Sequence, residues 1–154
     1  NSNYMANWFE CKVTYEKMVD NGTPKRTSEG YLVQGDTYTE IEERLTKELT
    51  PFTSLGELII NTIKRIKLAE LFLSDHPEDD RFYRCKVNFI SLDEAKGIEK
   101  RTAAAMIVQS DSLPNALNRL EKEMSTTLSP YEIASITETI IMDAWPIDFS
   151  KPNE

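Results

Sequence analysis

The feature that most constrains this 154-residue chain is an internal repeat. Trp8–Tyr15 aligns with Phe82–Phe89 at an offset of 74 residues, and Lys25–Thr27 is identical to Lys100–Thr102 at an offset of 75. Ten of the 26 positions from 25 to 50 are identical to those 75 residues later. A repeat of this length indicates one supersecondary unit used twice.

Each copy opens with a predicted β-hairpin. The first segment of each copy alternates apolar and polar residues, which is typical of a half-buried strand. The apolar positions are Phe9, Cys11, Val13 and Tyr15 in one copy, and Tyr83, Cys85, Val87 and Phe89 in the other. Turn residues follow at 20–22 and 93–97, so we expect second strands over about 27–34 and 102–109.

A helix is predicted next in each copy, beginning at Asp36/Thr37 and at Asp111/Ser112. Thr37 and Glu40 have the spacing of a capping box, and Pro114 suits a first helical turn. One apolar face follows at helical spacing in each copy. Its residues are Tyr38, Ile41, Leu45 and Leu49 in the first copy, and Leu113, Ala116, Leu117, Leu120 and Met124 in the second.

A long third strand closes each copy, over about 58–72 and 133–145. Its apolar phase changes near Lys64-Arg65, which predicts a bulge or bend there. The second and third strands flank a helix and should run parallel through a right-handed crossover. We therefore predict an α+β fold: a tandem pseudo-symmetric β-β-α-β repeat with a mixed β-sheet and helices packed on one face. We expect a single domain, 1–154, with repeats at 8–73 and 81–147 and tails at 1–6 and 148–154.

Composition narrows the class of protein. The net charge of −8 disfavours general attraction to nucleic acid or to an anionic membrane. The longest apolar run, 103–108, is far shorter than a membrane-spanning helix, and the first residues do not resemble a signal peptide. Two cysteines are too few for a disulfide framework. We expect a cytoplasmic protein without membrane contact.

The run 103–108 is apolar on both faces of its predicted strand, which implies a strand covered on both sides. Either the other half of the chain or a second subunit would cover it. Because symmetric dimers are common among soluble proteins, we expect a homo-oligomer.

Several residue types with chemical potential have a simpler interpretation. Cys11 and Cys85 fit buried small hydrophobic residues, and His76 fits a solvated turn. Glu70 and Asp143 occupy matching positions beside aromatic residues, where carboxylates act as acids or bases in some enzymes, but solvation at strand ends is the simpler interpretation. We expect no catalytic residues, no metal site and no cofactor.

Cations recur at equivalent positions in this acidic chain. Together with the aromatic residues beside them they form the predicted anion-binding residues: Lys12, Lys86, Lys25, Lys100, Arg26, Arg101, Trp8 and Phe82. Paired cations beside aromatic rings on a sheet face would bind a flat anion such as a nucleotide. A solvated sheet face, on which Lys and Arg maintain solubility, is the simpler interpretation of these cations.

Four segments carry a resemblance to a known family: Asn7–Val13, Lys86–Ile90, Tyr131–Ile136 and Ile140–Asp143. Over 8–146 the chain resembles a family of small proteins of Bacteroidetes and their phages, known only as a domain of unknown function. The resemblance implies a protein that works inside a bacterial cell or a phage-infected host cell. The resemblance supplies no catalytic residues.

These observations favour a non-catalytic, oligomeric binding protein that engages a small anionic ligand or a protein partner. If the chain is encoded by a phage, we expect it to act on the defence signalling of the host. The alternatives are a nucleic-acid accessory protein using the stripe 64–67, which the net charge disfavours, an enzyme using Glu70 or Asp143, or a structural component of a larger assembly.

Overall fold

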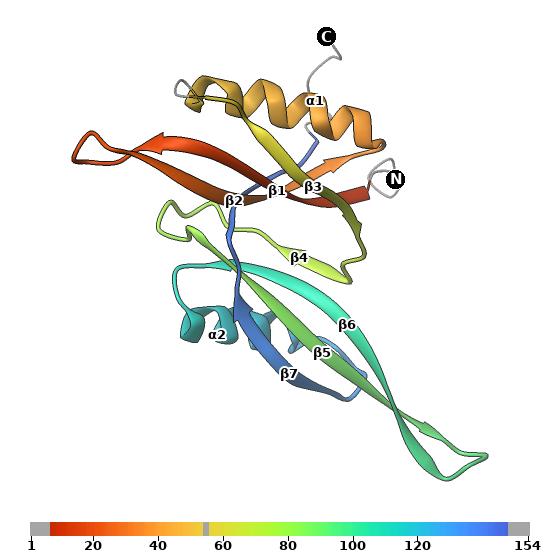
Figure 1. Ribbon diagram of the computed structural model, residues 1–154. Coiled ribbons are helices and arrows are strands. Elements are labelled where there is room, and N and C mark those ends of the chain that lie inside the picture. Colours follow the sequence, from red (N-terminus) through yellow and green to blue (C-terminus); the bar gives the residue numbers. More distant parts are fainter. Residues whose placement is uncertain (1–6, 54–55, 148–154) are drawn as a thin grey trace. The chain divides into compact units, whose positions relative to one another are not determined.

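The computed structural model describes residues 7–53 and 56–147, which form two four-stranded sheets with one α-helix on each (Figure 1). The elements in chain order are β1 (Asn7–Met18), β2 (Pro24–Gly35), α1 (Tyr38–Leu49), the short 3₁₀ helix η2 (Thr50–Phe52), β3 (Ile59–Ile66), β4 (Glu70–Phe72), β5 (Arg81–Asp93), β6 (Ile98–Ser110), α2 (Leu113–Met124), β7 (Tyr131–Glu138) and β8 (Ile141–Trp145). The predicted tails lie outside the described residues.

The strands are divided between two compact units. The first unit lies within residues 1–66 and 140–154, with the sheet order β3-β1-β2-β8. The second unit comprises residues 67–139, with the order β4-β6-β5-β7. The α+β class is confirmed, whereas the expectation of one mixed sheet is wrong because the chain passes from one sheet to the other after β3 and again after β7. The repeat relation between the halves stays a prediction.

The predicted hairpins and helix starts are confirmed. β1 pairs with β2 and β5 pairs with β6, both antiparallel and longer than expected. Thr37 caps α1 in a complete capping box with Glu40, and the Ser112 side chain accepts a hydrogen bond from the Asn115 backbone N–H at the start of α2. Such caps satisfy backbone N–H groups that have no partner within the helix.

Each helix covers one face of its own sheet. In the first unit Ile41, Leu45 and Leu49 pack on the inward residues of β1 and β2, and in the second Ala116, Leu120 and Met124 pack on those of β5 and β6. Tyr38 and Leu113, predicted on these faces, are about half exposed at 52% and 49%. They lie in the first turn, at the margin of the buried stripe.

The long third strand is broken in both halves. β3 ends at Ile66 and β4 begins at Glu70, while β7 ends at Glu138 and β8 begins at Ile141. The predicted bulge near Lys64-Arg65 is wrong in position. The register instead shifts at Asn61, because Lys12 pairs with Thr62 but Val13 with Ile60. β2 and β3 both run antiparallel to β1, so they are parallel as predicted, with β1 between them.

Both short strands pair with the sheet of the other half of the sequence. β8 lies parallel to β2, with Leu32 opposite Ala144 and Val33 opposite Trp145. β4 lies parallel to β6 over three residues, with Leu71 opposite Ile107. Each sheet is therefore completed by an edge strand that belongs to the other half.

Side chains of the first unit hold the end of β8. The Arg44 guanidinium of α1 donates a hydrogen bond to the Trp145 carbonyl oxygen at 3.0 Å and lies 5.7 Å from the Trp145 ring centroid. The Gln34 side-chain oxygen accepts a hydrogen bond from the Ile147 N–H at 2.9 Å. The hydrogen bond from the charged Arg44 guanidinium is stronger than a neutral one, so Arg44 fixes β8 beside β2.

The end of β4 is held in the same way in the second unit. Arg119 of α2 donates a hydrogen bond to the Leu73 carbonyl oxygen at 3.0 Å and lies 6.0 Å from the Phe72 ring centroid. The Gln109 side-chain oxygen accepts a hydrogen bond from the Ser74 N–H at 2.9 Å. A strand of three residues has few ladder bonds of its own, so these side-chain contacts carry much of its attachment.

Replacing either arginine with alanine should destabilise the chain. We expect Arg44→Ala and Arg119→Ala each to lower the free energy of unfolding by about 1–2 kcal/mol, because each removes a charged hydrogen bond and a cation–π contact. Urea denaturation followed by circular dichroism measures this. Lys122→Ala, on the exposed surface of α2, is the control and should change stability by less than about 0.5 kcal/mol. Equal effects of all three substitutions on stability would contradict the stabilising role given to Arg44 and Arg119.

Candidate functional site

A trough with a volume of about 470 Å³ lies on the second sheet, on the face away from α2. Tyr83, Cys85 and Val87 pack toward α2, so the alternate residues of β5 point to the opposite face. Small side chains of β6 leave the hollow. The trough is lined by Lys67, Arg84, Cys85, Lys86, Ala103, Ala104, Ala105, Ser135 and Thr137.

The charged groups of the trough are all cations. Lys67 and Lys86 are exposed, and neither forms an ion pair with any residue in the described ranges 7–53 and 56–147. Arg84 is half-buried beside them. Among the described residues that line the trough there is no carboxylate. The site therefore combines a small apolar floor with positive walls.

Register explains how these residues come together. Lys86 on the central strand β5 lies opposite Ala105 on one side and Ser135 on the other. Lys67 approaches from the segment that leads into β4, because the Ala69 N–H donates a hydrogen bond to the Ala105 carbonyl oxygen at 2.8 Å. Ala103 and Ala105 have no side-chain atoms beyond Cβ, so the space between Lys67 and Lys86 stays open.

The predicted cation pairs do not form one site. Lys86 lines the trough, whereas Lys12 lies on the first sheet opposite Gly30 and Thr62. The other four lie toward the hairpin ends, on β2 and β6: Lys25, Arg26, Lys100 and Arg101. Arg101 forms an ion pair with the Glu132 carboxylate at 2.9 Å. Of the six predicted cations, only Lys86 lines the trough.

The two predicted aromatic residues also differ in their surroundings. Phe82 is only 1% exposed, and a buried ring cannot stack on a ligand, so Phe82 drops out of the candidate site. Trp8 is half-buried near the start of β1, opposite Gln34 and Ile66. It lies on the first sheet and does not line the trough.

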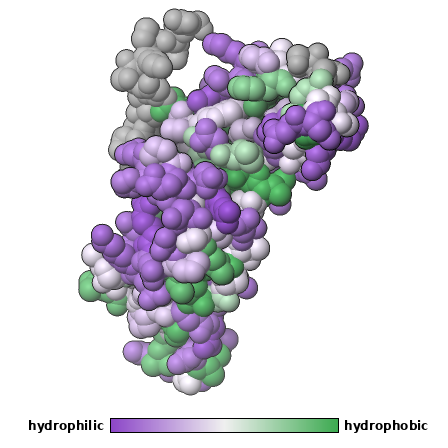
Figure 2. Space-filling view, turned by 90° about the vertical axis from the view of Figure 1, so that its left-hand side faces the viewer, coloured by the Kyte–Doolittle hydropathy of each residue, from purple (hydrophilic) through white to green (hydrophobic). Residues whose placement is uncertain are grey.

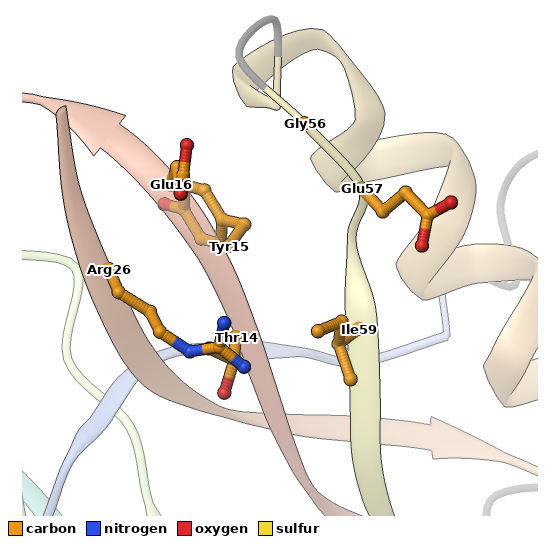
Figure 3. Close-up of a pocket in the computed structure, with 7 residues that line it drawn as sticks. All are labelled: Thr14, Tyr15, Glu16, Arg26, Gly56, Glu57 and Ile59. Atoms are coloured by element: carbon orange, nitrogen blue, oxygen red, sulfur yellow. The ribbon is translucent and has the colours of Figure 1, made fainter.

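A smaller hollow of about 250 Å³ lies in the first unit, where β3 separates from β1 (Figure 3). The ladder between these strands begins at the pair Thr14 and Ile59. Arg26 extends from β2 toward Thr14, and Glu16 and Glu57 also line this wedge, although the Glu57 carboxylate points away from it (Figure 3). Mixed charges make the wedge a poorer anion site than the trough.

A buried carboxylate in the first unit was not anticipated. Glu29 is 4% exposed, and its two oxygens accept hydrogen bonds from the Tyr15 hydroxyl at 2.8 Å and from the Tyr31 hydroxyl at 2.7 Å. The Lys17 ammonium nitrogen lies 3.5 Å from one carboxylate oxygen of Glu29. Burial, and then the hydrogen bond to Glu29, raises the pKa of Tyr15 to about 12 and raises that of Tyr31 as well. The sequence carried a signal: Glu29 has the strand parity of the inward residues Tyr31 and Val33.

The second half has apolar residues at the aligned positions. The counterparts of Tyr15, Glu29 and Tyr31 are Phe89, Ala104 and Met106, which all belong to or pack against the second core. A sheet of the same strand pattern thus forms without the polar network. The network is a property of the first unit alone.

The two cysteines, His76, Glu70 and Asp143 lie in surroundings that fit the simpler interpretations given to them from the sequence. Burial raises the pKa of Cys11 to about 12, with Glu10 adding to the effect, and raises that of Cys85 to about 11, so both thiols are protonated at neutral pH. His76 lies in an exposed turn in which its carbonyl oxygen accepts a hydrogen bond from the Asp79 N–H. Glu70 is exposed on β4 of the second sheet, and Asp143 is exposed on β8 of the first.

Among the described residues no group of three His, Cys, Asp or Glu side chains is placed to hold a metal ion. None of the described helices is long and apolar enough to cross a bilayer.

Comparison with known proteins places the chain in a family. Residues 7–147 match the family described as Domain of unknown function (DUF4494). The chain belongs to this family. The match spans both units, including the trough and the Glu29 network. No curated protein matches the chain.

Removing Glu29 alone should destabilise the fold more than replacing all three residues of its network, Tyr15, Glu29 and Tyr31, with apolar ones. We expect Glu29→Ala to lower the free energy of unfolding by about 2–3 kcal/mol, because it leaves two buried hydroxyl groups without their acceptor. The triple variant Tyr15→Phe, Glu29→Ala, Tyr31→Met copies the second half and should regain at least half of that loss. Urea denaturation measures both. A triple variant less stable than Glu29→Ala would contradict this interpretation.

The raised pKa of Tyr15 predicts a pH dependence of stability at alkaline pH. A tyrosine whose pKa is higher in the folded than in the unfolded chain favours folding below its unfolded pKa of about 10, and this contribution is lost as the pH rises toward about 12. Absorbance at 295 nm should show phenolate formation by Tyr15 near pH 12. A Tyr15→Phe variant should lack that part of the change. Titration of every tyrosine near pH 10 in the folded protein would contradict the prediction.

Proposed function

We propose that this chain is a non-catalytic protein that binds a small anionic, nucleotide-like ligand in the trough of the second sheet. The observation that carries the proposal is the pair of lysines, Lys67 and Lys86, facing an open floor of alanines without an acidic neighbour in the trough lining. A nucleotide presents a flat ring to the floor and phosphate oxygens to the ammonium groups.

The size and chemistry of the trough suit such a ligand. A volume of about 470 Å³ falls within the range of small-molecule sites, which bury an apolar part of the ligand and orient it with a few polar groups. Ser135 and Thr137 supply hydroxyl groups beside the cations. Arg84 adds a third positive charge, and guanidinium groups match phosphate in geometry.

Local charge matters here because the chain as a whole is acidic. With a net charge of −8, the average field repels anions, so binding depends on the short-range contacts of the trough. On the face seen in Figure 2 the surface is mostly hydrophilic and hydrophobic side chains form small separate groups. This view shows no large apolar docking surface on that face.

We further propose that the halves are related as a tandem pseudo-symmetric repeat and that only the second one binds. Gln34 and Arg44 secure β8 as Gln109 and Arg119 secure β4, at the sequence offset of 75. At the position of Arg84 the first half has Glu10, and an acidic group beside Lys12 opposes anion binding. One ligand per chain follows. The resemblance to phage proteins adds a sharper form, in which the ligand is a host nucleotide signal that the protein sequesters.

Charge reversal in the trough tests the proposal. Nucleoside mono-, di- and triphosphates, cyclic nucleotides and inorganic pyrophosphate would be titrated against the chain by calorimetry and thermal shift. For any ligand that binds, Lys86→Glu and Lys67→Glu should each weaken affinity at least about tenfold, which corresponds to about 1.4 kcal/mol.

Lys12→Glu is the matched control, because it makes the same charge change at the equivalent exposed position of the first sheet. It should change affinity less than about twofold. Loss of affinity in Lys12→Glu alone, or binding by none of these anions, would contradict the proposed site. Steep weakening of DNA or RNA binding with salt would instead support the nucleic-acid alternative.

A further inference from the structure

A polar cluster lies next to the trough, on the same face of the second sheet. β5 runs between β6 and β7 (Figure 1), so Asn88 of β5 lies opposite Ala103 on one side and opposite Glu132 on the other. Asn88 comes two residues after Lys86, and both side chains therefore point to the face away from α2. Because Lys86 and Ala103 line the trough, Asn88 and Glu132 lie at its margin.

Glu132 joins the cluster through one carboxylate oxygen. Its Oε1 atom accepts a hydrogen bond from the Asn88 side-chain nitrogen at 3.2 Å and another from the Arg101 Nε at 2.9 Å. The hydrogen bond from Asn88, and then that from Arg101, lowers the pKa of Glu132, so the carboxylate is ionised at neutral pH. An ionised carboxylate only accepts hydrogen bonds, which fixes the end of the Asn88 amide facing it as the nitrogen.

Both side chains keep acceptor capacity for a ligand. A carboxylate accepts up to about four hydrogen bonds and an amide oxygen about two, so two bonds to Oε1 do not saturate Glu132. Asn88 is half-buried and the Glu132 side chain is 44% exposed, which leaves both open to the trough side. Neighbouring acceptors favour a ligand that presents an N–H donor and disfavour one that presents a carbonyl oxygen.

The spacing along β5 suits the two ends of a nucleotide. A strand rises about 3.3 Å per residue, so residues two apart on one face are separated by about 6.6 Å. Phosphate oxygens held by Lys67 and Lys86 leave the ring over the small side chain of Ala103. The edge of that ring then lies beside Asn88 and Glu132.

We propose that the trough selects nucleotides whose ring carries an exocyclic amino group, as adenine and cytosine do, and that Asn88 and Glu132 make this selection. Asparagine pairs with adenine through two hydrogen bonds, and glutamate accepts one from the amino group of cytosine. A ring with a carbonyl oxygen at that position, such as hypoxanthine or uracil, places a further acceptor against two acceptors. The inference rests on the proposed function, because it names which nucleotides the same trough binds.

The first sheet has no such cluster at the equivalent place. The pair that corresponds to Asn88 and Glu132 is Thr14 and Ile59. Ile59 has no polar side-chain atom, and Thr14 is only 5% exposed with its hydroxyl 3.0 Å from that of Ser28. The selecting groups therefore belong to the unit that also carries the trough lysines.

Matched pairs of ligands test the selection on the unchanged full chain. Adenosine and inosine phosphates have equal charge and differ by an amino group in place of a carbonyl oxygen on the ring, as cytidine and uridine phosphates do. Calorimetry would compare the members of each pair as the mono-, di- or triphosphate that binds most tightly. In each pair that binds, the amino member should bind about tenfold more tightly, which corresponds to about 1.4 kcal/mol.

Substitutions assign the preference to the cluster. Asn88→Ala and Glu132→Gln should each reduce it to less than about threefold, because each removes an acceptor from the edge of the ring. Asn115→Ala, an exposed asparagine on α2 outside the trough lining, is the matched control and should keep the preference. Lys86→Glu should weaken both members of a pair alike and leave their ratio unchanged.

The outcomes separate this inference from the proposed function. Equal binding of amino and carbonyl members by the native chain, weakened in Lys86→Glu, overturns the selection and leaves the anion site standing. Binding of no nucleotide overturns both. A full preference that persists in Asn88→Ala and in Glu132→Gln overturns the role of these residues. If a variant does not fold, as judged by circular dichroism, the comparison on the native chain still decides.

Discussion

The structure depends on two short strands, β4 and β8. Each comes from one half of the sequence and pairs in parallel with the sheet of the other half. A sheet edge exposes unpaired N–H and C=O groups, and a strand of three to five residues has too few ladder bonds to hold its place alone. β4 and β8 meet this constraint through the same pair of side chains, an arginine from the covering helix and a glutamine from the neighbouring strand. The first unit therefore needs β8, which follows the whole second unit in the sequence, whereas β4 lies within the continuous segment 67–139 of the second unit.

The sequence predicted local structure well and long-range pairing poorly. Alternation of apolar residues around Cys11 and Cys85, and the cap at Thr37, depends on neighbours close in the chain, and the structure confirms these elements. The break between β3 and β4 could not be predicted, because no residue type requires it. It arises when Lys67–Ala69 crosses into the other sheet. The single sheet expected from one continuous strand became two sheets for that reason.

The candidate site shows the same division between local and long-range information. Lys86 was identified from its repeated position, but its partners in the trough, Lys67, Ala103 and Ala105, come from other strands and had no motif to mark them. Phe82 was chosen as an aromatic neighbour, and burial removed it. Glu29 carries a signal in the sequence, because it is a charged residue among positions of inward parity. Its two tyrosine donors show how a strand tolerates a carboxylate on its inward face.

The most direct test of the account is a measurement of the hydrogen bonds that attach β4 and β8 to their sheets. Through-hydrogen-bond NMR couplings in labelled protein join an amide nitrogen to the carbonyl carbon of its acceptor. Couplings from the Gly30 nitrogen to the Ile140 carbonyl and from the Ala69 nitrogen to the Ala105 carbonyl are predicted, since these bonds, at 3.0 Å and 2.8 Å, lie just before β8 and β4 begin. Contacts that place β4 beside β2, or β8 beside β6, would contradict the sheet orders described above.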